Sequence, residues 1–226
     1  MTTEGANYLF IIDTNQYAGN FEREMTAYLT GHVGECEVGY DMAKSFRKEV
    51  KEKNLFKGVA SVPDEYGCFR PATIWPNPRY ASDGMGGEYL IEGANQEKLC
   101  KRYVKSVENY ANIEGKKKFI ERVRNKERGT EGYTLRGVEK ELKEAEKRIE
   151  EAKKIKTVPA YPAYLSVGIW FDTKPTEEEI RIMKERAEIF PTAYDKANRK
   201  YNLIKGLKIE GFRLISFKKS ASEEAC

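Results

Sequence analysis

The sequence predicts an α+β fold, a ferredoxin-like βαββαβ sandwich with an inserted antiparallel helical hairpin. The first observation is an internal repeat: apolar runs at 8–12 and 164–171 are each followed by Asp-Thr and then by an amphipathic segment. The second is a highly charged stretch with helical periodicity, 96–156, between the two halves. We therefore expect a body built from 1–95 and 157–226, with the hairpin at 96–156.

Five elements are expected in the first half of the body. They are strands at 8–12, 68–75 and 88–91 and helices at 21–29 and 41–53. Phe21, Met25 and Leu29 recur every four residues, which places them on one helical face. Asn20 directly precedes this face and is the expected N-cap. Pro71 favours an edge position for its strand.

The inserted segment has the periodicity of two packed helices. The first is expected from 96 to 128, with an interruption at Gly115, because glycine weakens a helix interior. The second has apolar residues at alternating spacings of three and four, which is a heptad seam. These residues are Leu135, Val138, Leu142, Ala145, Ile149 and Ala152. Because the seam is short, we expect the two helices to pair within the chain.

The second half repeats the strand–helix–strand order, with strands at 164–171 and 207–217. Between them, Thr176 and Glu179 have the spacing of a capping box and predict a helix start. Pro191 is expected to end this helix, and 195–203 to form another short one. Gly211 predicts a bulge or bend in the last strand.

Composition excludes several classes of protein. The 226 residues are 40% hydrophobic and 34% charged, and no apolar run approaches the roughly 18 residues needed to cross a bilayer. The N-terminus lacks the basic-then-apolar order of a secretory signal. The four cysteines are widely spaced without a Cys-x-x-Cys pair, which argues against a zinc site or a disulfide framework. We expect a cytoplasmic protein without a membrane partner.

Charge is unevenly divided along the chain. Residues 1–97 hold 9 basic and 15 acidic residues, a net charge of −6, whereas 98–226 hold 31 and 21, a net charge of +10. Basic clusters attract phosphates, although they also form ordinary solvated helix faces. The candidate residues for binding nucleic acid or a partner are Lys101, Arg102, Lys105, Lys116, Lys117, Lys118, Arg122, Arg124, Lys208 and Arg213.

The polar run between the first strand and its helix is a candidate ligand loop, since loops at strand ends often carry binding residues. Its candidate residues are Asn15, Tyr17, Asn20 and Glu22. The alternative is a structural turn in which Asn20 caps the helix.

Asp13 and Asp172 follow the two strands that we expect in the centre of the sheet. We expect these strands to be parallel neighbours, which would bring both carboxylates to one sheet edge. Paired carboxylates could hold a divalent cation for phosphoryl transfer, and no other cofactor is expected. The alternative is that each Asp-Thr pair forms an ordinary turn. His32, the only histidine, favours a capping or surface role.

Aromatic residues gather around a stretch rich in proline and glycine. They are Tyr66, Phe69, Trp75, Tyr80 and Tyr89. Such a cluster can form a stacking or protein-binding surface, and it can equally be a loop folded over the core.

Residues 8–25 (YLFIIDTNQYAGNFEREM) resemble the start of uncharacterised bacteriophage-encoded proteins, and so do residues 69–76 (FRPATIWP). The resemblance implies no catalytic or binding residues. It implies a setting in the host cytosol, where small phage accessory proteins act on host machinery that includes defence systems.

Three functions follow as hypotheses. The first is a non-enzymatic binding protein, an inhibitor of a host defence (CRISPR-type) nucleoprotein, whose partner is a host protein or ribonucleoprotein with RNA or DNA. The second is a metal-dependent enzyme that acts on a nucleotide or nucleic acid through Asp13 and Asp172. The third is a virion or scaffold component that assembles through the hairpin. The lack of a convincing catalytic set in the sequence favours the first.

Overall fold

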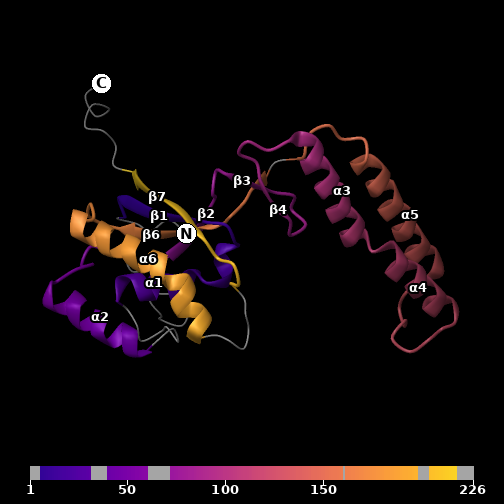
Figure 1. Ribbon diagram of the computed structural model, residues 1–226. Helices are drawn as coiled ribbons and strands as arrows, with labels where there is room; N and C mark the ends of the chain where they lie inside the picture. The colour runs from indigo at the N-terminus through magenta and orange to yellow at the C-terminus, as the bar shows by residue number, and fades with distance from the viewer. Residues whose placement is uncertain (1–5, 32–39, 61–71, 160, 198–203, 218–226) are drawn as a thin grey trace, which may run out of the picture. The chain divides into compact units, whose positions relative to one another are not determined.

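The structure is a computed structural model that describes residues 6–31, 40–60, 72–159, 161–197 and 204–217. Over these ranges it is a mixed α+β protein with two antiparallel sheets (Figure 1). The chain divides into two compact units. The body unit comprises Met1–Asn77 and Tyr164–Cys226, and the inserted unit comprises Pro78–Ala163. The inserted unit thus holds a small sheet in addition to the segment 96–156.

The body unit is built on a four-stranded sheet. Its described elements in chain order are β1 (Tyr8–Thr14), η1 (Ala18–Asn20), α1 (Glu22–Thr30), α2 (Tyr40–Glu52), β2 (Ala72–Trp75), β6 (Ser166–Phe171), α6 (Glu177–Ala197) and β7 (Ile209–Ser216). The strands lie in the order β2-β6-β1-β7, and every neighbouring pair is antiparallel. The sheet therefore brings the two halves of the sequence together.

The direction of the central strands differs from the prediction. β1 and β6 lie side by side, but they are antiparallel rather than parallel. A helical crossover makes the two strands that it joins parallel. Here β1 and β2 enclose β6, and β6 and β7 enclose β1. Because the two crossovers interleave in this way, neighbouring strands run in opposite directions.

The core of the body lies between the sheet and its helices, which Figure 1 shows on one side of the sheet. Side-chain alternation along β1 sends Phe10 and Ile12 to this side. They pack with Phe21, Tyr28 and Phe190, and all five side chains are at most 1% exposed. Burial of each large apolar side chain contributes about 1.5–3 kcal/mol, so this layer fixes the helices on the sheet.

α6 begins where its capping box predicts. The backbone N–H of Glu179 donates to Thr176 Oγ1 (3.2 Å), and Glu179 Oε2 accepts from the backbone N–H of Thr176 (2.8 Å). Glu179 Oε1 also accepts from the backbone N–H of Phe56 (2.7 Å). Glu179 is only 9% exposed, and its side chain joins the start of α6 to the segment after α2.

Pro191 does not end α6, contrary to the prediction, because the helix continues to Ala197. A proline inside a helix removes one backbone hydrogen bond. Phe190 and Tyr194 lie on either side of it, are buried in the core and hold the helix in place. The first residues of the short helix expected at 195–203 belong to α6, and 198–203 lie outside the described residues.

The last strand carries the expected bulge beside Gly211. Asp13 of β1 pairs with Gly211, whereas the next residue, Thr14, pairs with Ile209. Glu210 is therefore the extra residue, as in a β-bulge.

The inserted unit consists of a three-stranded sheet and three described helices. They are β3 (Tyr80–Ser82), β4 (Glu88–Leu90), α3 (Gln96–Ala111), α4 (Ile113–Arg124), α5 (Leu135–Ala152) and β5 (Tyr161–Pro162). The strand order is β4-β3-β5. α5 packs along both α3 and α4 (Figure 1). Of the heptad seam, Val138, Ala145, Ile149 and Ala152 are buried.

The break between α3 and α4 falls at Asn112 and not at Gly115. Asn112 adopts a left-handed conformation (φ 44°, ψ 55°), and its side chain accepts a hydrogen bond from the backbone N–H of Gly115 (3.1 Å). Asparagine is one of the few residues that tolerate this conformation. Gly115 lies inside α4, where the space that a side chain would fill is taken by the Asn112 side chain.

None of the helices in the described ranges combines the length and the apolar character required to span a bilayer.

Candidate nucleic-acid interface

The exposed side of α3 carries a stripe of cations. Lys98, Arg102 and Lys105 are spaced by four and three residues, so they share one helical face, and all three are exposed. Leu99 and Val107, which are buried, belong to the opposite face. The stripe therefore points away from α5, which covers the apolar face.

Arg102 is also tied to the small sheet. Its guanidinium lies 4.8 Å from the centre of the Tyr89 ring and donates to the carbonyl oxygen of Glu88 (3.4 Å). Tyr89 in turn donates from its hydroxyl to Asp83 (2.6 Å). Burial and the hydrogen bond to Asp83 together raise the pKa of Tyr89 to about 12. Tyr89 is therefore protonated at neutral pH and holds the sheet under the start of α3.

Several of the predicted cations already have carboxylate partners. Lys101 pairs with Glu97 (2.6 Å) and Lys116 with Glu141 (3.6 Å). Arg122 contacts Glu127 (3.2 Å), and Arg124 lies against Glu121 and Glu139. In the described part of the chain, Lys105, Lys117 and Lys118 are exposed and take part in no ion pair. Among the predicted lysines of α3 and α4, these three are the ones without a carboxylate partner in the described ranges.

The two units differ in charge. By the residues that each contains, the inserted unit has 20 basic and 15 acidic residues, a net charge of +5, and the body has 20 and 21, a net charge of −1. Positive potential therefore belongs to the inserted unit, and it favours approach of a polyanion.

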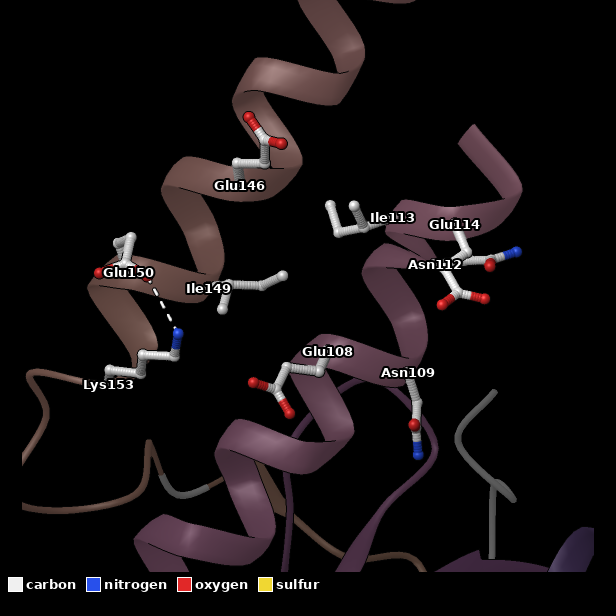
Figure 2. A pocket seen from close by; sticks show the side chains of 9 residues that line it. All are labelled: Glu108, Asn109, Asn112, Ile113, Glu114, Glu146, Ile149, Glu150 and Lys153. Carbon is white, nitrogen blue, oxygen red and sulfur yellow. Dashed lines mark hydrogen bonds and ion pairs between the residues drawn. The ribbon is translucent and has the colours of Figure 1, made fainter. Parts of the chain in front are cut away.

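One side of the inserted unit is acidic. An open groove of about 690 Å³ between α5 and the α3–α4 pair is lined by Glu108, Glu114, Glu146 and Glu150 (Figure 2). The lysine in it, Lys153, is 3.0 Å from the Glu150 carboxylate and is already paired. Because these carboxylates repel phosphates, a polyanion is expected to approach from the stripe on α3 instead.

Lys208 and Arg213 belong to the body unit, away in sequence from the other candidates. Arg213 is engaged: its Nε and Nη2 donate to the two carboxylate oxygens of Asp13 (2.8 and 2.6 Å), and Nη2 also reaches the carbonyl oxygen of Pro76 (3.0 Å). Lys208 is exposed, and its backbone N–H donates to Asn15 Oδ1 (2.8 Å).

The candidate ligand loop is fastened to the turn before β7. Asn15 Nδ2 donates to the carbonyl oxygen of Gly206 (3.1 Å), and its Oδ1 accepts from Lys208. Gln16 Nε2 donates to the carbonyl oxygen of Lys205 (2.8 Å). The amides of this loop therefore act as structural ties.

The remaining loop residues have separate places. Tyr17 is 47% exposed and its ring covers Gly19, where an added Cβ would lie 2.6 Å from the ring. Asn20 is exposed and is not the cap of α1, contrary to the prediction. The N-cap position is Phe21, without a side-chain hydrogen bond, because Asn20 is the last residue of the 3₁₀ turn. Glu22 lies in the first turn of α1, where the helix dipole favours an acidic residue.

Asp13 and Asp172 do not meet, so the predicted two-aspartate metal site is wrong. In the antiparallel pair Asp13 lies opposite Ser166, and Asp172 follows the far end of β6. Six strand residues separate these positions, which is about 20 Å. Asp13 accepts from Ser166 Oγ (2.6 Å) and from Arg213. Nowhere in the described ranges do three carboxylate, thiol or imidazole groups gather as a metal ion requires.

The structure describes three members of the predicted aromatic cluster: Trp75 belongs to the body, and Tyr80 and Tyr89 belong to the inserted unit. Tyr66 and Phe69 lie outside the described residues, as does His32. Trp75 instead contacts Trp170 and Phe217, with ring centres 6.4 and 6.5 Å away. Side-chain alternation in 164–171 places Trp170 on the sheet face opposite to Ile169 and Phe171, and this pattern is visible in the sequence.

No protein-family model matches the chain, and no curated protein or solved structure matches it either.

Proposed function

We propose that the chain is a non-enzymatic binding protein whose inserted unit binds the phosphate backbone of a nucleic acid, alone or within a nucleoprotein. The exposed stripe on α3, with Lys105 beside Lys98 and Arg102, carries this proposal. Lys117 and Lys118 of α4 add two exposed cations in a unit with a net charge of +5. Lysines without a carboxylate partner need not break an ion pair to bind phosphates, and the release of counterions from the nucleic acid drives binding.

Two observations support a binding role rather than a catalytic one. The carboxylate of Asp13 is neutralised by Arg213. The amide of Asn15 is occupied by backbone groups. A carboxylate neutralised by a guanidinium and an amide bonded to the backbone are poorly placed to activate a substrate.

The narrower proposal, inhibition of a host defence nucleoprotein, rests on the sequence resemblance of 8–25 and 69–76 to bacteriophage-encoded proteins. A cationic unit is compatible with it, because a nucleoprotein presents phosphates as well as protein.

We also infer a ferredoxin-like body and a helical hairpin in the inserted unit. The strand order β2-β6-β1-β7 with two interleaved helical crossovers supports the first. The packing of α5 along both α3 and α4 supports the second.

The test is fluorescence anisotropy of labelled RNA and DNA strands, single and double, with the full chain. We expect binding that weakens linearly on a logarithmic salt scale between about 50 and 200 mM. The triple variant Lys105→Ala/Lys117→Ala/Lys118→Ala should bind about tenfold or more weakly at low salt. Its slope should fall by about 2, since each phosphate contact contributes about 0.7–0.9.

The control removes three exposed lysines from the body: Lys48→Ala/Lys53→Ala/Lys57→Ala. It changes the net charge equally, so it should leave the slope nearly unchanged if binding is localised on the inserted unit. Binding that does not depend on salt, or an equal loss in both triple variants, would show that the exposed lysines of the inserted unit are not the interface.

A further inference from the structure

One face of the body sheet has an unusual composition. The helices of the body pack on the other face, and among the described residues of the body no helix packs on this one. The free face of an antiparallel sheet is normally polar. Here it carries Leu9 and Ile11, which are 0% exposed although they point away from the helices. Something other than a helix therefore shields them.

Three aromatic rings form a cluster on the same face. Trp170 is the register partner of Leu9, and Trp75 lies two positions along β2 from Thr73 on the same face. Ring centres are 6.4 Å apart between Trp75 and Trp170 and 5.4 Å apart between Trp170 and Phe217. Phe217 is 46% exposed and both tryptophans are partly exposed. The rings therefore cover the sheet with one side and meet solvent with the other.

A glycine at the centre of the face makes room for the side chains of Leu9 and Thr73. A Cβ at Gly168 would be 2.8 Å from Leu9 Cδ1 and 3.0 Å from Thr73 Cγ2. Any side chain at this position would push these neighbours outward. The centre of the face is therefore filled by Leu9 and Thr73, and the exposed apolar side chain beside it is that of Phe217.

The exposed charge on this face is positive. Asp13 and Arg213 are the charged residues at the registered positions of the face. The Asp13 side chain is 9% exposed and that of Arg213 is 32% exposed, so the guanidinium covers the carboxylate. Two hydrogen bonds fix the guanidinium plane. A planar cation beside aromatic rings suits a base and its phosphate better than an acidic or a purely apolar partner.

We propose that this face binds unpaired nucleotides, with bases stacked on Phe217, Trp75 and Trp170 and a phosphate or base edge on Arg213. The inference rests on the proposed function in taking nucleic acid as the ligand, but it uses the other unit of the chain. A duplex hides the faces of its bases, so the ligand class is single-stranded RNA or DNA.

The probe is an oligothymidylate of about 15 nucleotides, a length that suits stacking sites, with the matched duplex as comparison. Both tryptophans of the chain lie in this cluster, so their fluorescence reports binding directly. We expect the single strand to quench it and the duplex to leave it nearly unchanged. Phe217→Leu should weaken single-strand binding about 5- to 100-fold, and Phe217→Tyr should restore it.

Tyr17→Leu is the matched control, because Tyr17 is 47% exposed in the same unit but lies outside the strand register. It should bind as the wild type does. If Phe217→Leu binds normally and fluorescence does not respond, while the lysine variant and salt still weaken binding, this inference is overturned and the proposed function stands. If no oligonucleotide binds at low salt, both are overturned. Concentration-dependent dimers that Phe217→Leu abolishes, without quenching by oligothymidylate, would make the face a self-association surface and overturn the inference.

Discussion

Arg213 holds Asp13 through two parallel hydrogen bonds, from Nε to Oδ2 at 2.8 Å and from Nη2 to Oδ1 at 2.6 Å, across 200 residues of sequence. Ser166 Oγ donates a further hydrogen bond to Oδ1 (2.6 Å). Asp13 is only 7% exposed. The pair joins β7 to β1 at the point where the bulge begins, so it fastens the last strand of the chain to the first.

Arg213→Ala should destabilise the body unit by about 3 kcal/mol, because it leaves a buried carboxylate without its cation. This value is at the low end for such losses, since Arg213 is partly exposed and Ser166 remains. Urea unfolding followed by tryptophan fluorescence measures it, because Trp75 and Trp170 both belong to the body.

Arg181→Ala is the control for this change. Arg181 contacts Glu178 and Glu185 with half of its side chain exposed, and surface pairs of this kind contribute at most about 1 kcal/mol. Equal losses in the two variants would mean that the Asp13–Arg213 pair has no special role.

Substitution of Asn112 should destabilise the inserted unit for two separable reasons: its backbone is left-handed, and its side chain caps α4. Asn112→Ala removes both and should cost about 1–2 kcal/mol. Asn112→Gly keeps the backbone freedom and should cost only about a few tenths. Helical circular dichroism during urea unfolding, with amide exchange over Ile113–Arg124, measures the difference. Equal costs would assign the whole effect to the lost cap.

Gly115→Ala should fail to give the roughly 1 kcal/mol gain that alanine usually brings inside a helix. The new Cβ would meet the Asn112 side chain at 2.4–2.7 Å and displace the cap. Gly137→Ala in α5 is the matched substitution, since Gly137 donates to the cap residue Thr134 in the same way but its added Cβ would be 3.0 Å away. A larger loss at Gly137 than at Gly115 would contradict this explanation.

Asp83 should make the inserted unit lose stability in acid. Burial by itself raises the pKa of Asp83, but hydrogen bonds from Ser106, Tyr89 and the backbone N–H groups of Met85 and Gly87 outweigh it, and the net pKa is lowered. A lowered pKa in the folded state stabilises the fold above the ordinary carboxyl value near pH 4. That contribution is lost as the pH falls through the lower folded value.

The amide signals of Met85 and Gly87, which donate to Asp83 Oδ1 at 2.8 and 2.9 Å, give the measurement. Their chemical shifts should titrate with a midpoint below the ordinary aspartate pKa of about 3.9. Asp83→Asn should flatten the acid loss and reduce amide protection at neutral pH. An unchanged acid dependence in Asp83→Asn would exclude Asp83 as its source.

Elements with a strong local pattern could be predicted from the sequence. The strand at 8–12, the capping box of Thr176 and Glu179 and the buried seam of α5 depend on neighbours within a few residues. Where a local rule competes with packing, the prediction fails. Pro191 stays inside α6 because Phe190 and Tyr194 are buried around it, and the helix break moves from Gly115 to Asn112 because the Asn side chain supplies a cap.

The candidate sites were predicted unevenly for the same reason. Cations on α3 could be placed on one face from their spacing alone, but whether each is already paired depends on neighbours such as Glu141, which lies on another helix. The aromatic face joins Trp75, Trp170 and Phe217 from three strands or strand ends. No local pattern connects residues so far apart.

The sequence by itself determined the helices and strands with a strong local pattern, where charge gathers and which faces are apolar, because these follow from side-chain periodicity and local hydrogen bonds. Tertiary structure alone decided that β1 and β6 run in opposite directions. That direction separates Asp13 from Asp172 and leaves Asp13 to Arg213. The physical reason is that strand direction depends on how the two crossovers interleave and not on any local pattern. The same arrangement decides which distant residues, such as Asp13 and Arg213, become neighbours.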